Sequence, residues 1–142
     1  MKLFLDCSDA EFIRDAYSTG LIDGVTTNPS LMLKAGKDPR EVLKEISDIF
    51  PFHASVSAEV IGDSVEEMLE MADDYIEIGP NITIKVPLTP EGLKVCKDLS
   101  SDDVAVNVTL CFLQHKQYLL LRQVQHTYPL LLVVYTINHL MD

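Results

Sequence analysis

The sequence predicts an α/β fold of the (β/α)8 TIM barrel type, in which only about five βα units are present. Short β-type runs alternate with helical patterns along the chain, and this alternation indicates a parallel sheet. The runs are polar on one face, whereas the strands of an open doubly wound sheet usually read as continuous apolar runs. The sequence has no glycine-rich phosphate loop, which argues against dinucleotide binding. Together these observations favour a barrel.

Five strands and four helices are predicted in alternation. Strands are expected at residues 2–5, 24–27, 53–58, 82–86 and 104–109. Apolar residues at helical spacing predict helices at residues 9–19, 39–49, 64–75 and 89–99. Ser8 is the expected N-cap of the first helix, Phe12 and Ile13 belong to its apolar face, and Gly20 is its expected stop. Ser64 is expected to open a capping box at the start of the third helix.

Composition and charge limit the classes of partner. A chain of 142 residues with 47% hydrophobic residues fits one domain with a core. The net charge of -11 argues against binding nucleic acid or an anionic membrane, but it leaves open a small phosphorylated ligand in a local cationic pocket. The apolar run at residues 1–6 is too short for a signal peptide, and no run reaches the ~20 apolar residues of a membrane span. Cys7, Cys96 and Cys111 have neither paired nor metal-ligand spacing, so we expect a cytoplasmic protein without a metal.

Lys85 is the most informative candidate residue, because it lies in the β-type run NITIKVP at residues 81–87. Side chains alternate along a strand, so Lys85 points away from the apolar side chains of Ile84 and Val86. In a poorly solvated cavity the pKa of a lysine falls, and its amine becomes a nucleophile suited to Schiff-base formation. The alternative is a solvated lysine on an edge strand, where it would discourage aggregation.

Polar side chains also lie at or just past the C-terminal ends of the other predicted strands. They are Asp6, Thr26, Asn28, Glu59, Asn107 and Thr109. A barrel enzyme assembles its active site from the C-terminal ends of several strands, so these residues are candidates for one site with Lys85. Five of these residues also have a structural alternative. Asp6 could cap a helix, Asn28 could be a turn residue before a proline, and Glu59 could be a charge at the rim, while Asn107 and Thr109 could bind neighbouring backbone.

On these residues the chain resembles the small bacterial transaldolase family, which includes fructose-6-phosphate aldolase. The matching motifs keep the family's order over residues 1 to about 112. They are FLD at residues 4–6, GVTTNPSL at 24–31, VSAEV at 56–60, IKVP at 84–87 and NVTL at 107–110. The resemblance implies a TIM barrel of the class I aldolase type that transfers a dihydroxyacetone unit between sugar phosphates, without cofactor or metal, in the pentose phosphate pathway. It also implies that the intact family member is a homo-oligomer.

The resemblance implies a role for each candidate. Lys85 resembles the Schiff-base lysine, which attacks the C2 carbonyl of a ketose phosphate, and Asp6 resembles the acid/base group for the C4 hydroxyl. Glu59, together with Thr109, resembles the pair that holds the catalytic water. The implied substrate-binding side chains are Thr26, Asn28 and Asn107.

Alternatives remain within and outside this reaction class. A glutamate at position 59 resembles transaldolases, whereas the fructose-6-phosphate aldolase branch carries glutamine, so transfer is favoured over simple aldol cleavage. The TTNPS text at residues 26–30 argues against a lysine aldolase of the deoxyribose-phosphate type. From a different class, the chain could be a non-catalytic fragment that assembles with other protein.

The composition changes after Phe112, and the family pattern stops there. All the glutamines lie in residues 113–142, whereas all six glycines precede that segment. One back-translation of residues 120–136, read two bases out of frame, gives AKAGATYISPFVGRLH, which contains the SPFVGR text of the family's phosphate-binding strand. We therefore expect a barrel part at residues 1–112 and an anomalous tail at 113–142, produced by a frameshift or a sequencing error. The competing hypothesis is a natural short protein whose tail packs on the partial barrel. In both cases the phosphate clamp is missing, so we expect the chain to be inactive.

Overall fold

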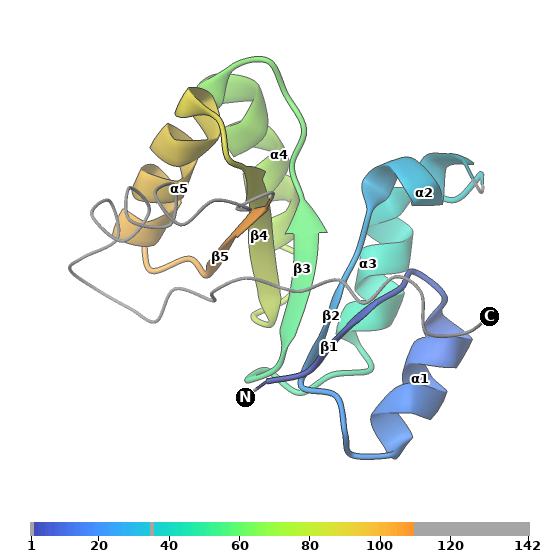
Figure 1. Cartoon of the computed structure of the whole chain (residues 1–142). Helices are drawn as coiled ribbons and strands as arrows, with labels where there is room; N and C mark the ends of the chain where they lie inside the picture. The colour runs from blue at the N-terminus through green and yellow to red at the C-terminus, as the bar shows by residue number, and fades with distance from the viewer. Residues whose placement is uncertain (1, 35, 110–142) are drawn as a thin grey trace.

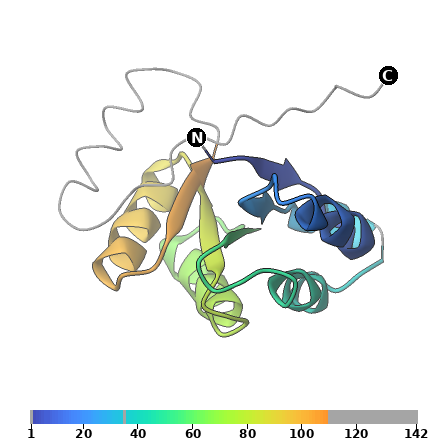
Figure 2. The same ribbon diagram turned by 90° about the horizontal axis from the view of Figure 1, so that it is seen from below.

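The computed structural model describes residues 2–34 and 36–109 as one parallel sheet with helices between its strands (Figure 1). The strands are β1 (Phe4–Asp6), β2 (Gly24–Thr26), β3 (Ser55–Glu59), β4 (Ile82–Pro87) and β5 (Val106–Thr109). Their order in the sheet is the order in the sequence, β1-β2-β3-β4-β5, and every neighbouring pair is parallel. In Figure 2 the sheet is curved and the helices lie along its outer side. Sequential strand order with helices on one face is the arrangement of a barrel, so the predicted incomplete (β/α) barrel is confirmed.

Within residues 2–34 and 36–109 five helices connect the strands, one more than the sequence predicted. They are α1 (Ala10–Ser18), α2 (Pro29–Lys34), α3 (Pro39–Ser47), α4 (Val65–Ile76) and α5 (Pro90–Ser101). The predicted bounds of the other four helices and of all five strands agree with the structure within two residues at each end. None of the helices in the described ranges is long and apolar enough to cross a membrane.

Two local predictions about α1 are wrong. Asp9, not Ser8, is the N-cap, because the Asp9 carboxylate accepts the backbone N–H groups of Glu11 and Phe12 at 3.0 and 3.1 Å. Phe12 is 52% exposed, whereas Ile13 is fully buried. The apolar stripe of α1 is therefore narrower than the sequence pattern indicated. The predicted capping box of α4 is confirmed, since Ser64 and Glu67 each bind the other's backbone N–H.

The hydrophobic core lies between the helices and the face of the sheet opposite Lys85. Fully buried side chains of the strands on this face include Val25, Val56, Ala58, Ile84 and Val86. The helices contribute fully buried side chains to the same cluster, among them Ile13, Leu43, Ile46 and Val95. Since the apolar side chains of each strand face the helices, the alternate polar side chains face the concave side of the sheet.

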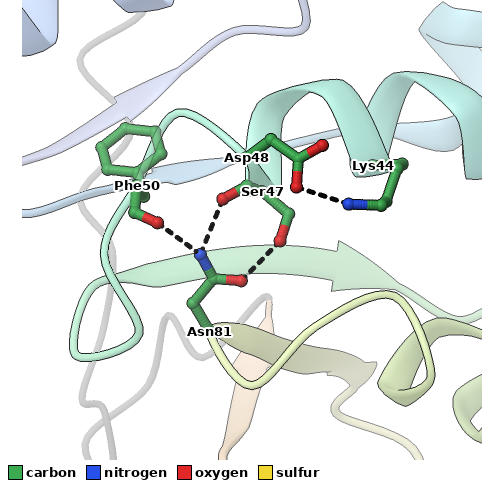
Figure 3. Close-up of polar contacts among 5 residues, drawn as sticks. All are labelled: Lys44, Ser47, Asp48, Phe50 and Asn81. Atoms are coloured by element: carbon green, nitrogen blue, oxygen red, sulfur yellow. Dashed lines mark hydrogen bonds and ion pairs between the residues drawn. The ribbon is translucent and has the colours of Figure 1, made fainter.

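A buried amide joins the end of α3 to the start of β4 (Figure 3). The Asn81 amide nitrogen donates to the carbonyl oxygens of Ser47 and Phe50 at 2.9 and 3.1 Å, and its oxygen accepts the Ser47 hydroxyl at 2.6 Å. On the exposed side of α3, Lys44 forms an ion pair with Asp48. The Asn81 contacts bind one carbonyl at the end of α3 and one beyond it, and they fix where β4 begins.

Two buried acids predict that stability falls at alkaline pH. Burial raises the pKa of the Cys96 thiol above its ordinary 9.0, although a hydrogen bond with Ser100 partly offsets the rise. Burial also raises the pKa of Tyr75 above 10.0, with smaller contributions from Asp38 and Asp74. The folded state therefore holds these protons more tightly than the unfolded state, and the free energy of unfolding decreases as pH rises above about 9.

Urea unfolding from neutral pH to about pH 10 checks this prediction. The Cys96→Ala variant is expected to be less stable at every pH, because it leaves a small cavity, but to lose the part of the decline that begins near the thiol's ordinary pKa. An unchanged decline in this variant would show that Cys96 is not its source.

Candidate active site

The register of the sheet brings five of the candidate side chains onto two neighbouring levels of its concave face. On the upper level, Glu59 pairs with Lys85, and Lys85 pairs with Asn107. On the lower level, Asp6 pairs with Thr26, and Thr26 pairs with Ser57. Neighbouring strands are about 4.8 Å apart, so side chains on the same face are near one another. Polar groups from all five strands therefore surround one space on the concave face.

Lys85 is largely buried and lies next to a carboxylate. Its side chain is 16% exposed, that of Glu59 is 22% exposed, and Lys85 Nζ donates to Glu59 Oε2 at 3.4 Å. β4 pairs with β3 on one side and with β5 on the other, so it is an interior strand. The interpretation of Lys85 as a solvated lysine on an edge strand is therefore wrong.

Asp6 lies at the C-terminal end of β1 and is held by a threonine. Thr26 is 2% exposed, and its hydroxyl donates to Asp6 Oδ1 at 2.7 Å. The alternative in which Asp6 caps α1 is wrong, because Asp9 occupies that position. One oxygen of the Asp6 carboxylate is thus fixed by a neutral donor.

A cavity of about 400 Å³ opens between the segments that follow β1 and β2. Its lining residues are Asp6, Cys7, Ser8, Asp9, Asn28, Met32 and Lys37. Asp6 and Asn28, two of the candidates, therefore share one cavity, and Asp6 connects it to the concave face of the sheet. Lys85, Glu59 and Asn107 do not line this cavity. Met32 belongs to the short helix α2 and Lys37 follows it, and neither was foreseen because this helix was not predicted.

Asn107 contacts a side chain that the sequence did not single out. Asn107 is 2% exposed, and its amide nitrogen donates to the hydroxyl of Ser57, a fully buried residue of β3, at 3.4 Å. Ser57 lies on the polar face of its strand by alternation, but only a three-dimensional contact could have supplied a role for it.

Thr109 ends β5 on the same face as Asn107, in register with Pro87 and one level above Lys85. It is half-buried. Within the described residues no hydrogen bond joins Thr109 to Glu59, so the expected pair is brought to the same end of the sheet without direct contact. In this part of the chain no group of three or more His, Cys, Asp or Glu residues could hold a metal ion.

The arrangement suits carbonyl chemistry at an amine. A lysine amine that loses its proton to a nearby carboxylate can add to a ketone, and a second carboxylate at another strand end can move a proton on the substrate. The two carboxylates have different hydrogen-bond donors. Glu59 accepts from the Lys85 ammonium, whereas Asp6 accepts from the Thr26 hydroxyl.

Comparison with known proteins agrees with this geometry. A sequence model of the transaldolase/fructose-6-phosphate aldolase family matches residues 3–129. A protein of Paracoccus denitrificans described as a probable transaldolase is 52% identical over 112 residues, which are 79% of this chain and 51% of that protein. A probable transaldolase of Geotalea daltonii is 47% identical over 112 residues, which are 79% of this chain and 51% of that protein. The chain thus spans about half the length of the curated relatives it matches. It belongs to the transaldolase/fructose-6-phosphate aldolase family.

Proposed function

We propose that Lys85 is the nucleophile of a transaldolase-type reaction, in which a dihydroxyacetone unit passes from a ketose phosphate to an aldose phosphate through a Schiff base. The observation that carries this proposal is the Lys85–Glu59 pair, with an Nζ–Oε2 distance of 3.4 Å on an interior strand of the partial barrel. Membership of the family supports the reaction class.

In the first half of the proposed reaction, Glu59 accepts a proton from the Lys85 ammonium, and the free amine adds to the C2 carbonyl of the ketose. Glu59 returns this proton to the hydroxyl of the adduct, and loss of water gives the protonated imine. Asp6 then accepts the C4 hydroxyl proton, the C3–C4 bond breaks, an aldose leaves, and the bond's electrons form a three-carbon enamine on Lys85.

In the second half, the enamine carbon adds to the carbonyl carbon of an acceptor aldose, and Asp6 returns the proton to the new hydroxyl. A water activated by Glu59, with Thr109 beside it, hydrolyses the imine and frees Lys85. Asn28, Asn107 and Thr26 are the proposed hydrogen-bonding partners of the dihydroxyacetone unit. Thr26 belongs to β2, Asn28 to the segment that follows β2, and Asn107 to β5.

Glu59 also bears on the reaction type. A carboxylate at this position supports transfer, because it resembles the transaldolase branch, and the runner-up function is fructose-6-phosphate aldolase. Measuring free dihydroxyacetone release against transfer to an acceptor aldehyde in a frame-restored protein separates the two functions.

Reductive trapping tests the role of Lys85 in the 142-residue chain itself. Dihydroxyacetone with cyanoborohydride is expected to label Lys85, and peptide mass spectrometry locates the label. The Lys85→Met variant is expected to lose it, whereas Lys94→Met, which changes an exposed lysine of α5, is expected to keep it. Labelling spread over exposed lysines with none at Lys85 would refute the proposal.

We also propose that the chain as written does not catalyse transfer, because remote phosphate binding is needed to orient the sugar over Lys85. The segment in which the phosphate clamp is expected, residues 113–142, lies outside the described residues. With fructose 6-phosphate as donor and an aldose phosphate as acceptor, we expect no transfer product. Formation of that product by the 142-residue chain would overturn the proposal.

A further inference from the structure

The Ser57–Asn107 contact shows how strongly the sheet curves. Ser57 belongs to β3 and Asn107 to β5, and β4 lies between them. In a flat sheet two such strands would be about 10 Å apart, too far for these short side chains to meet easily. Their side chains nevertheless approach to 3.4 Å over β4. The contact therefore crosses the concave face directly beside the base of Lys85.

The register defines where the contact crosses. Ser57 is level with Thr83, which precedes Lys85 by one residue of the concave face. Asn107 is level with Lys85 itself. The line between them passes diagonally between the side chains of Thr83 and Lys85. The contact holds the Asn107 amide at the base of the concave face. In the sheet order Glu59 lies on one side of Lys85 and Asn107 on the other.

The chemistry of the contact fixes the orientation of the amide. The Asn107 nitrogen donates to the Ser57 hydroxyl, which leaves the amide oxygen as a hydrogen-bond acceptor for another group. Ser57 is 0% exposed and Asn107 is 2% exposed, so water does not readily replace either partner. Without the hydroxyl, the amide could turn over and present nitrogen instead of oxygen.

We propose that Ser57 is a positioning residue that orients Asn107 so that its amide oxygen accepts a hydroxyl of the ketone bound at Lys85. This inference rests on the proposed function and extends it to substrate choice. The Ser57–Asn107 pair favours a ketone with a hydroxyl next to the carbonyl over a ketone without one, because only the hydroxylated ketone can donate to the amide oxygen.

Two ketones separate this role from a general structural role. Dihydroxyacetone carries hydroxyls beside the carbonyl and acetone carries none, so acetone reports the reactivity of Lys85 without the hydroxyl contact. For each ketone, the rate of cyanoborohydride labelling at Lys85 is measured against ketone concentration. In Ser57→Ala we expect the preference for dihydroxyacetone over acetone to fall about fivefold to tenfold, the effect of one hydrogen bond.

Ser55 provides a matched control on the same strand and the same face. Its hydroxyl is 2.7 Å from the Thr83 hydroxyl and makes no contact with Asn107 among the described residues. Ser55→Ala is expected to keep the wild-type preference. A Ser57→Ala, Asn107→Ala double variant is expected to lose no more preference than Asn107→Ala alone, because both changes remove one interaction. Equal losses with both ketones in Ser57→Ala, or additive losses in the double variant, would overturn the inference.

If no ketone labels Lys85 in the wild-type chain, the proposed function itself is contradicted. A second measurement then still tests the role of Ser57. In the nitrogen-15 spectrum of the chain, the side-chain NH2 of Asn107 is expected to exchange with water faster in Ser57→Ala than in Ser55→Ala. Equal exchange in the two variants would refute the orienting role of Ser57.

Discussion

Gly92→Ala is expected to destabilise the chain by about 3 kcal/mol, although alanine is the better helix former. Gly92 is a buried residue in the first turns of α5. A Cβ atom added there would lie 2.0 Å from the carbonyl oxygen of Pro87 and 3.1 Å from its carbonyl carbon. These are backbone atoms at the end of β4, so no side chain can move aside, and α5 must shift away from the strand.

Urea unfolding measures this effect, and Gly62→Ala is the matched control. At Gly62 the added Cβ would lie 3.0 Å from the side chain of Glu67, and its three nearest neighbours are all side-chain atoms. Because side chains can move aside, Gly62→Ala is expected to lower the free energy of unfolding by less than about 1 kcal/mol. Pro87 is two residues beyond Lys85, and the displacement of α5 from the end of β4 is therefore also expected to slow labelling of Lys85. Similar stabilities for Gly92→Ala and the wild-type chain would show that α5 adjusts without cost.

The faces of the strands could be predicted from the sequence because alternation in a strand needs no tertiary information. Lys85 and Asn107 fall on the polar face by parity, and the structure has both there. The register could not be predicted. It depends on how neighbouring strands slide past one another, and it decides that Glu59, rather than Ser57, is level with Lys85.

Features that depend on few residues or on distant ones were missed. The helix α2 has only six residues, too few for a periodic pattern, and its opening Asn-Pro text is also typical of a turn. Ser8 and Asp9 are adjacent and both can cap a helix, so the sequence pattern could not separate them. Ser57 and Asn107 are separated by 50 positions and meet only because the sheet curves.

The boundary at residue 112 and the frameshifted tail stay predictions. Residues 110–142 lie outside the described residues, and the family match runs to residue 129. The nucleotide sequence of the gene checks the frameshift, because the shifted frame after Phe112 is expected to encode the SPFVGR text. In the sheet as described, β1 and β5 are the outer strands, so each has a free edge available for pairing. Gel filtration of the chain distinguishes a defined assembly from aggregate through such edges.

Asn81→Asp is expected to cost about 3–5 kcal/mol, although the two side chains have almost the same shape. Asn81 is 5% exposed, and its nitrogen donates to the carbonyl oxygens of Ser47 and Phe50. In the variant a carboxylate oxygen would face both carbonyls, with no proton between them and little water. The variant therefore loses two hydrogen bonds and buries an unpaired charge.

The pH dependence of the Asn81→Asp variant distinguishes buried charge from lost packing. The folded state disfavours the charged form, so the pKa of the new carboxyl is higher in the folded than in the unfolded chain. Between these two values the folded state binds more protons, and the loss of stability relative to the wild-type chain becomes smaller as pH falls. Ser47→Ala removes only the hydroxyl contact to Asn81 and is expected to cost about 1 kcal/mol without this pH dependence. Asn81 fixes the start of β4 and hence the level at which Lys85 meets Glu59. If the loss of stability in Asn81→Asp does not change with pH, β4 has moved to relieve the buried charge.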